Sequence, residues 1–232
     1  MLRLPGTYRA QGDTALLAGT LARRGAVAGA RVLDVGTGGG ALALAAVRAG
    51  ARSVTAVDLS LRSVASARLN ALLHRAPVRV LRGDLFAPVR GRSFDVVLAN
   101  PPYVPAETDV LPRHRPGRSW DGGRDGRAVI DRICDGVADV LVPGGRLLMV
   151  QSALADEEAT LEHLRRNGFT ATVVARADEP FGPVMRARAE ALRARGLLRP
   201  GQAHEELVVV EATAPSAAPA PQGRDGGFES VA

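Results

Sequence analysis

The sequence predicts an α/β protein built on a doubly wound, mostly parallel sheet. Two observations carry this prediction: short apolar runs alternate with helical patterns along the chain, and a glycine-rich turn follows the first apolar run. The chain has 232 residues, 46% of them hydrophobic, which is enough to bury the core of one such domain. Seven runs are predicted to be strands, at residues 31–35, 54–57, 78–81, 94–99, 146–151, 170–175 and 206–211.

Helices are predicted between these strands and ahead of the first. Ser60 is suited to cap the amino end of one of them, because its hydroxyl can accept from an orphan backbone amide of the first turn. Gly168 is expected to end another. The predicted helices cover residues 16–24, 41–49, 61–74, 127–141, 156–167 and 185–195.

Three segments fall outside this alternation. Residues 104–126 form a long loop directly after a strand, and we expect a lid there, because loops of that length in compact domains are usually functional or disordered. Residues 178–203 separate the last two strands and are predicted to be a helical insertion. Residues 213–232 are rich in Ala, Pro and Gly and are predicted to be a disordered tail. The main domain is therefore expected to span residues 31–212.

The charge balance allows two explanations. The formal net charge is +6 and all 30 basic residues are arginine. Arginine pairs well with phosphate, so contact with RNA is one explanation; coding from a GC-rich genome is the other. We favour the second, because the arginines are spread along the chain, with Arg113, Arg115 and Arg118 as one local cluster.

Several classes of site and location are disfavoured by the sequence. Cys134 is the one cysteine and the four histidines are scattered, so neither an internal disulfide nor a metal site is expected. The first residues do not resemble a signal peptide, and no apolar stretch is long enough to span a bilayer. We therefore expect a cytoplasmic protein without a membrane partner.

The most informative motif is Asn100-Pro101-Pro102-Tyr103, which follows the apolar run at residues 94–99. The two prolines end that strand sharply, because neither can donate to the ladder. They create a rigid shelf at the carboxyl end of a strand, where open α/β sheets bind ligands. The amide side chain, the proline carbonyls and the aromatic ring suit a planar substrate that bears an NH2 group, such as a carboxamide or an exocyclic base amine.

A second candidate site is the glycine-rich turn at residues 36–40. Gly36, Gly38 and Gly40 allow a tight turn and close approach to a ligand, and such a loop also fits dinucleotide binding. Asp34 favours a different ligand, because its carboxylate can meet a cationic amino group but would face a pyrophosphate unfavourably.

Acidic residues follow the next two strands as well. Asp58 fits ribose hydroxyls under either interpretation, and Asp84 with Leu85 supplies an edge suited to an adenine amino group. A nicotinamide dehydrogenase is disfavoured by Asp34 and by the lack of a catalytic Tyr-Lys or His arrangement.

Together these motifs resemble those of class I S-adenosylmethionine-dependent methyltransferases, and within them the HemK/PrmC-like group that methylates protein glutamine on nitrogen. The matching segments are residues 32–40, 56–58, 83–85 and 100–104. Asp13-Thr14 is similar to the family's N-terminal segment, and residues 120–127 are similar to the Gly-Gly-x-x-Gly-Arg loop of its shorter branch, which lacks a helical N-terminal domain. The resemblance covers about residues 7–176 and weakens in the insertion at residues 178–203.

The resemblance implies a Rossmann-like methyltransferase fold whose last strand is antiparallel, with residues 1–30 covering the cofactor. It also implies roles for individual residues. The methionine part of S-adenosylmethionine is expected at Asp34 and the Gly36–Gly40 turn with help from Thr14, the ribose at Asp58, the adenine at Asp84 and Leu85, and the acceptor nitrogen at Asn100.

The chemistry expected at the shelf is methyl transfer to a planar nitrogen. Accepting the two amide hydrogens at the Asn100 side-chain oxygen and the Pro101 carbonyl would orient the nitrogen and stabilise its developing positive charge, while Tyr103 packs against the amide. Asn100, Pro101 and Tyr103 are therefore the predicted catalytic residues.

The identity of the acceptor stays open at this point. The leading hypothesis is a protein glutamine, such as that of a translation release factor, because residues 120–127 resemble the protein-methylating branch. An exocyclic base amine in RNA or DNA, a small-molecule acceptor and a non-catalytic cofactor-binding protein are the alternatives. The need for a small activating subunit is also left open.

Overall fold

The computed structural model describes residues 12–25, 27–109 and 119–216, and its seven strands form one sheet in the order β3-β2-β1-β4-β5-β7-β6. Strands β1 to β5 run parallel to one another, and β7 is antiparallel to both β5 and β6. The predicted doubly wound sheet with an antiparallel last strand is thus confirmed. The strands are β1 (Arg31–Val35), β2 (Ser53–Asp58), β3 (Val78–Arg82), β4 (Phe94–Ala99), β5 (Leu141–Ser152), β6 (Thr170–Pro180) and β7 (His204–Thr213).

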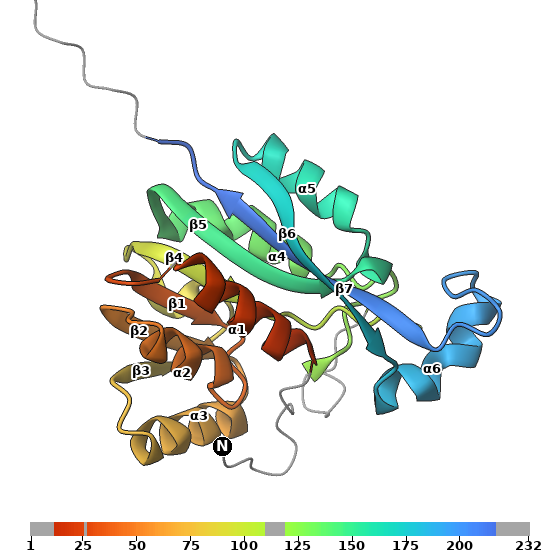
Figure 1. Ribbon diagram of the computed structural model, residues 1–232, viewed down its shortest axis with the longest axis horizontal. Helices are drawn as coiled ribbons and strands as arrows, with labels where there is room; N and C mark the ends of the chain where they lie inside the picture. Colours follow the sequence, from red (N-terminus) through yellow and green to blue (C-terminus); the bar gives the residue numbers. More distant parts are fainter. Residues whose placement is uncertain (1–11, 26, 110–118, 217–232) are drawn as a thin grey trace, which may run out of the picture.

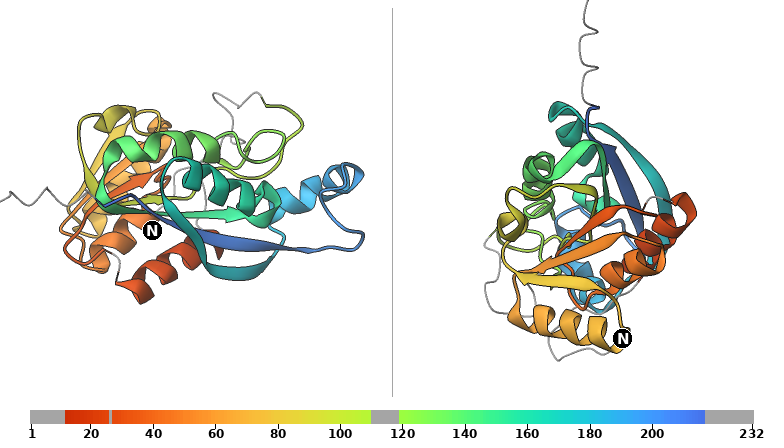
Figure 2. Two further views of the ribbon diagram at one scale, coloured as in Figure 1. Left: turned by 90° about the horizontal axis from the view of Figure 1, so that it is seen from above. Right: turned by 90° about the vertical axis from the view of Figure 1, so that its left-hand side faces the viewer.

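Helices cover both faces of the sheet, as Figures 1 and 2 show. One face carries α1 (Gly12–Arg24), α2 (Ala41–Arg48) and α3 (Leu61–Leu73); the other carries α4 (Ile130–Gly136) and α5 (Glu157–Arg166). The sixth helix, α6 (Pro183–Ala194), lies between β6 and β7 at the projecting end of that strand pair. Short 3-10 turns are η1 (Ala87–Val89), η3 (Val137–Val140) and η4 (Ala153–Ala155).

Alternating side chains of the central strands build two separate cores. Val32 and Val96 face the core beneath α1 and α2, whereas Leu33 and Val97 face the core beneath α4 and α5. All four are fully buried or nearly so, as expected for parallel strands covered on both faces. The glycine-rich turn and the shelf therefore emerge from a rigid, dry sheet.

Two predicted helices differ from those observed by more than two residues. The first begins at Gly12, four residues before the predicted start, because its first turn makes the contacts described below with the shelf. The predicted helix at residues 127–141 is wrong in extent: α4 covers only Ile130–Gly136 before a 3-10 turn. Residues 127–129 precede the helix, although the Asp131 amide already donates to the Arg127 carbonyl at 2.9 Å, as in the first turn of a helix. Gly136, against which the Phe86 ring packs, ends the α-helical stretch.

Two predicted strands, β5 and β6, are too short by more than two residues at one end. β5 begins at Leu141 rather than at residue 146, because Leu141 pairs with Phe94 before the register shifts through a proline and two glycines. β6 continues to Pro180 because it pairs with the whole of β7. The predicted insertion at residues 178–203 therefore leaves the sheet only after Pro180.

Two further expectations fall wholly or partly on residues that are not described. The arginine cluster Arg113, Arg115 and Arg118 lies outside the described residues, as do residues 217–232 of the predicted tail and residues 1–11. Among residues 12–25, 27–109 and 119–216, no helix combines the length and the apolar character needed to cross a membrane.

Candidate active site

Four predicted polar residues lie along one edge of the sheet. Asp34, Asp58, Asp84 and Asn100 sit in or directly after β1, β2, β3 and β4, and these strands are parallel neighbours in the order β3-β2-β1-β4. Their carboxyl ends therefore meet at the same rim (Figure 1). Residues that are far apart in the sequence therefore lie next to one another along this edge of the sheet.

Asp34 is the most buried member of this row. One carboxylate oxygen, Oδ2, accepts from the Thr37 hydroxyl at 2.5 Å and from the Ala43 amide at 2.9 Å. The other, Oδ1, has no hydrogen-bond partner among the described residues. Burial raises the pKa of Asp34 to about 6, against the opposing effect of these two hydrogen bonds and with a small contribution from the charge of Asp58. A buried carboxylate with an unpaired oxygen suits a cationic partner.

The glycine-rich turn follows directly and is held from two sides. Gly36, Gly38 and Gly40 all adopt positive φ angles, of 72°, 55° and 87°, which side chains on L-residues disfavour. The Asn70 side chain donates to the Gly39 carbonyl at 2.9 Å. A Cβ on Gly40 would lie 3.4 Å from the backbone of Ala67, so α3 packs directly on the turn.

Asp58 closes the same turn. Its carboxylate accepts from the Gly38 amide at 2.9 Å and from the Ser60 amide at 2.8 Å. A carboxylate offers about four acceptor positions, so ribose hydroxyls are compatible with these two bonds. The sequence predicts Asp58 as a ligand-binding residue, but its contribution to holding the turn is not revealed by the Gly-rich spacing alone.

Asp84 has a competing partner. It forms a 2.6 Å ion pair with Arg132 of α4, and both side chains are about half exposed. Leu85 beside it adopts a positive φ of 43° and packs on the core beneath α4. Arg132 was not among the predicted site residues. It lies in α4, 48 positions from Asp84 in the sequence, and no motif indicates this contact.

The shelf is joined to the first turn of α1. Asn100 donates from Nδ2 to the Thr14 hydroxyl at 3.2 Å, and the Tyr103 hydroxyl donates to the Asp13 carboxylate at 3.1 Å. Tyr103 is 8% exposed and Asp13 is 3% exposed, so this second bond is buried. Thr14, predicted at the cofactor site, therefore lies next to Asn100, and Tyr103 holds α1 to the shelf.

The other end of α1 is fixed as well. Arg24 forms a 2.7 Å ion pair with Glu211 of β7, whose side chain is 9% exposed. Between the two ends, Leu17 and Leu21 are buried against the sheet. Both ends of the helix are thus fixed to the sheet, which holds its first turn over the rim.

The two ends of the predicted lid pair with each other. The Val104 amide donates to the Trp120 carbonyl at 2.8 Å, and the Gly122 amide donates to the Val104 carbonyl at 3.0 Å. A Cβ on Gly126 would lie 2.3 Å from the Tyr103 carbonyl oxygen, so this glycine packs directly on the shelf. The Gly-Gly-x-x-Gly-Arg motif is thereby a structural support for the shelf. Residues 110–118, in the middle of the loop, lie outside the described residues.

The arginine of that motif is buried, although nothing in the motif itself predicts this. Arg127 is 8% exposed and donates from Nη1 to the Ala155 carbonyl at 2.7 Å and to the Thr160 hydroxyl at 2.9 Å. A charge-assisted bond from Nη2 to Asp131 at 2.6 Å completes the network. Arg127 therefore fastens the loop to the start of α5.

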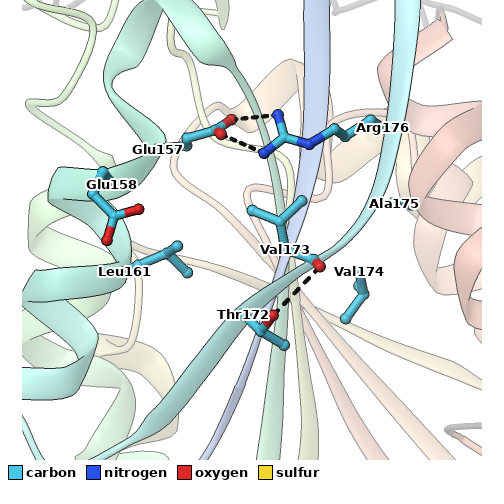
Figure 3. A pocket seen from close by; sticks show the side chains of 8 residues that line it. All are labelled: Glu157, Glu158, Leu161, Thr172, Val173, Val174, Ala175 and Arg176. Carbon is cyan, nitrogen blue, oxygen red and sulfur yellow. Dashed lines mark hydrogen bonds and ion pairs between the residues drawn. The ribbon is translucent and has the colours of Figure 1, made fainter.

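A separate groove lies between α5 and β6 (Figure 3). Arg176 bridges Glu157 at 2.5 Å and Glu206 at 2.7 Å there. None of the predicted site residues lines this groove, and its charged groups already have partners: Glu157 pairs with Arg176, and Glu158 pairs with Arg165 outside the groove. The candidate site is therefore the rim and not this groove.

Comparison with known proteins identifies the family to which this chain belongs. Residues 7–112 match the methyltransferase small domain. A Methanocaldococcus jannaschii protein assigned as a protein N5-glutamine methyltransferase is 35% identical over 154 residues, which cover 66% of this chain and 78% of that protein. The chain belongs to the protein N5-glutamine methyltransferase family. It is therefore an S-adenosylmethionine-dependent methyltransferase, as the resemblance of its motifs indicated.

Two further proteins are similar to this chain, one in sequence and one in fold. The release factor glutamine methyltransferase of Geobacter sulfurreducens is 35% identical over 163 residues, and the chain spans 57% of its length. The solved structure of the E. cuniculi Mtq2–Trm112 complex, described as responsible for methylating the eRF1 termination factor, has a TM-score of 0.62 and 23% identity. That match covers 90% of this chain and 99% of that one, and it supports the fold.

Proposed function

We propose that this methyltransferase transfers a methyl group from S-adenosylmethionine to the side-chain amide nitrogen of a glutamine in a protein. The observation that carries the proposal is the position of Asn100. It lies at the end of β4, in the same row as the buried Asp34, and its side chain contacts Thr14 of the covering helix. An amide-binding group thus stands beside a site suited to a cationic cofactor.

The residues of the rim fit the cofactor. Its ammonium group would be held by the unpaired Oδ1 of Asp34, and the positive-φ glycines would admit its methionine portion. Asp58 would bind the ribose hydroxyls, and Leu85 with Asp84 would bind the adenine after Asp84 exchanges its Arg132 partner. When bound, S-adenosylmethionine supplies an electrophilic methyl group on a sulfonium.

The chain's own contribution is orientation and electrostatics. The Asn100 side-chain oxygen and the Pro101 carbonyl would accept the two hydrogens of the glutamine amide, which fixes its nitrogen in line with the methyl group. The same oxygens would stabilise the positive charge that develops on nitrogen. Tyr103 and Asp13 keep the shelf rigid beneath the acceptor.

A translation release factor is the acceptor we propose. Relatives 35% identical to this chain are named for release factor glutamine methylation, and a 42% identical relative from Bradyrhizobium diazoefficiens is named for ribosomal protein uL3. Both names describe protein glutamine as the acceptor. The Gly-Gly-x-x-Gly-Arg loop that supports the shelf is the motif that resembles the protein-methylating branch.

The test is methyl transfer from labelled S-adenosylmethionine to a purified release factor, to the same factor with its acceptor glutamine changed to alanine, and to total RNA. We expect label on the first alone, located on glutamine by mass spectrometry of the tryptic peptide. Label on RNA that is removed by nuclease would overturn the proposal in favour of a base amine. That alternative is favoured by one observation, the suitability of the Asn100 shelf for any planar NH2 group.

A further inference from the structure

The helix α6 contacts both ends of the loop that follows the shelf. We call residues 104–109 the first arm and residues 119–126 the second arm of this loop. α6 projects beyond the rest of the sheet on the β6–β7 pair (Figures 1 and 2). Although α6 is about 60 to 90 residues away in sequence, two of its arginines reach both arms.

Arg188 makes the first connection. Its Nη1 donates to the Pro105 carbonyl at 3.2 Å in the first arm, and its Nη2 donates to the Asp121 carboxylate in the second arm. The Asp121 side chain is 13% exposed and that of Arg188 is 28% exposed. A partly buried, charge-assisted pair of this kind is stronger than an ordinary surface ion pair.

Arg195, two helical turns beyond Arg188, makes the second connection. Its Nη1 donates to the Ala106 carbonyl at 2.9 Å, and its Nη2 donates to the Arg124 carbonyl at 2.6 Å. Each arginine therefore uses the two sides of its planar guanidinium group to join one arm to the other. A lysine would fit this geometry less well, because its compact ammonium group lacks the planar array of donors that reaches both arms at once.

The two arms and α6 pack against each other and against the shelf. The Ala106 amide donates to the Gly123 carbonyl at 2.8 Å, next to the two hydrogen bonds between Val104 and the second arm. The inner side of α6, at Met185, Ala189 and Leu192, is buried in the same core as Tyr103 and Val104. Movement of α6 is therefore coupled mechanically to the segment beside Asn100.

We propose that Arg188 and Arg195 are positioning residues that set acceptor specificity, because they fix the two arms as a rigid wall next to Asn100. This inference rests on the proposed function, and it specifies which part of a protein acceptor the enzyme recognises. The wall would contact the protein segment that flanks the glutamine. These arginines would therefore change the affinity for a protein acceptor and leave the affinity for the cofactor unaltered. The insertion between β6 and β7 thereby becomes part of the substrate-binding unit.

The decisive experiment compares Arg188→Gln, Arg195→Gln and the double variant with Arg193→Gln. Arg193 is the matched control, because it lies on the same helix but donates to the Gln202 carbonyl rather than to an arm. For the double variant we expect the KM for the release factor to rise about five- to twentyfold, with the affinity for S-adenosylmethionine within about twofold of wild type. Arg193→Gln should match wild type in both, and Arg188→Lys should recover part of the loss.

Hydrogen exchange gives a readout that does not depend on the acceptor. The amides of Val104, Ala106 and Gly122 should exchange faster in the double variant, and those of β4 should not change. Unchanged exchange at these three amides would overturn the positioning role. Faster exchange with an unaltered KM for the release factor would overturn the specificity role. If wild-type protein methylates no glutamine, the proposed function fails instead, and the exchange data still decide whether the arginines position the arms.

Discussion

The two halves of the rim are assembled in different ways. The cofactor half, from β1 to β3, combines short-range contacts, at Asp34 with Thr37 and Ala43, with contacts of intermediate range: Asp58 and Gly38 are 20 positions apart, and Asn70 and Gly39 are 31 apart. The acceptor half, around β4, depends on remote ones: Asn100 and Thr14 are 86 positions apart, and Tyr103 and Asp13 are 90 apart.

This difference has a functional consequence. The glycine-rich turn is held by contacts within residues 34–70, so changes in more distant segments should leave its cofactor geometry unaltered. A site held by remote segments changes whenever one of them changes, which makes it the natural place for acceptor specificity. Damage to one half should therefore leave the other half largely intact.

The largest expected effect is at Asn100. Asn100→Ala should lower kcat about 100- to 1000-fold, because it removes an acceptor aimed at the reacting nitrogen, while the cofactor Kd stays within about threefold. Its counterpart is Asn70→Ala, which removes the bond to Gly39 in the cofactor half and should raise the cofactor Kd with little change in kcat. Calorimetry and turnover assays measure both quantities. Equal losses of binding and turnover in Asn100→Ala would contradict the separation of the halves.

Asp34 should show opposite effects on stability and binding. Burial raises the pKa of Asp34 to about 6, above the value near 4 expected in the unfolded chain. The folded protein therefore binds more protons between these values, so the stability of the ligand-free protein falls as the pH rises through 6. Asp34→Asn should raise the Tm at pH 8 by removing up to ~3 kcal/mol of this cost, and much less at pH 4.

The same change should weaken cofactor binding about tenfold or more, because it removes the charge that would meet the ammonium group. Thermal unfolding at both pH values, together with calorimetric titration of S-adenosylmethionine, measures the two effects. A lower Tm for Asp34→Asn at pH 8 would refute the role of the buried charge.

Gly126 tests the support of the acceptor half. Gly126→Ala places a Cβ 2.3 Å from the Tyr103 carbonyl oxygen at a φ of 80°, and we expect it to cost about 2–3 kcal/mol of folding free energy. Gly144→Ala is the matched control, because Gly144 has a φ of 73° but no atom within 4 Å of its Cβ position; it should cost about 1 kcal/mol. Urea unfolding measures both. Similar losses for the two variants would mean that φ alone, and not contact with the shelf, matters.

The smallest effect is expected at Arg132. Arg132→Gln removes the half-exposed partner of Asp84, which should raise cofactor affinity about twofold, because Asp84 no longer exchanges an ion pair for adenine. Arg165→Gln, which breaks a similarly exposed pair with Glu158, should leave the affinity unchanged. Weaker cofactor binding in Arg132→Gln would assign Arg132 to the site rather than to competition.

Much of the molecule could be predicted because the relevant signals are local. The alternation of apolar runs predicts the seven strands, and the residues that follow them predict the row Asp34, Asp58, Asp84 and Asn100, since parallel strands end at one rim. Element ends were less predictable where tertiary contacts override local preference. Pairing with β7, for example, lengthens β6 beyond its predicted end.

The sequence by itself determined the fold class, the family and the composition of the rim, because each depends on periodicity or on short consecutive motifs. Only the tertiary structure decided what holds the acceptor half together: Thr14 and Asp13 against the shelf, Arg127 beneath it, and Arg188 and Arg195 of α6 on the two arms. The physical reason is that an arginine's partners depend on which remote carbonyls and carboxylates the packed core brings within reach. Residue spacing along the chain does not encode that distance.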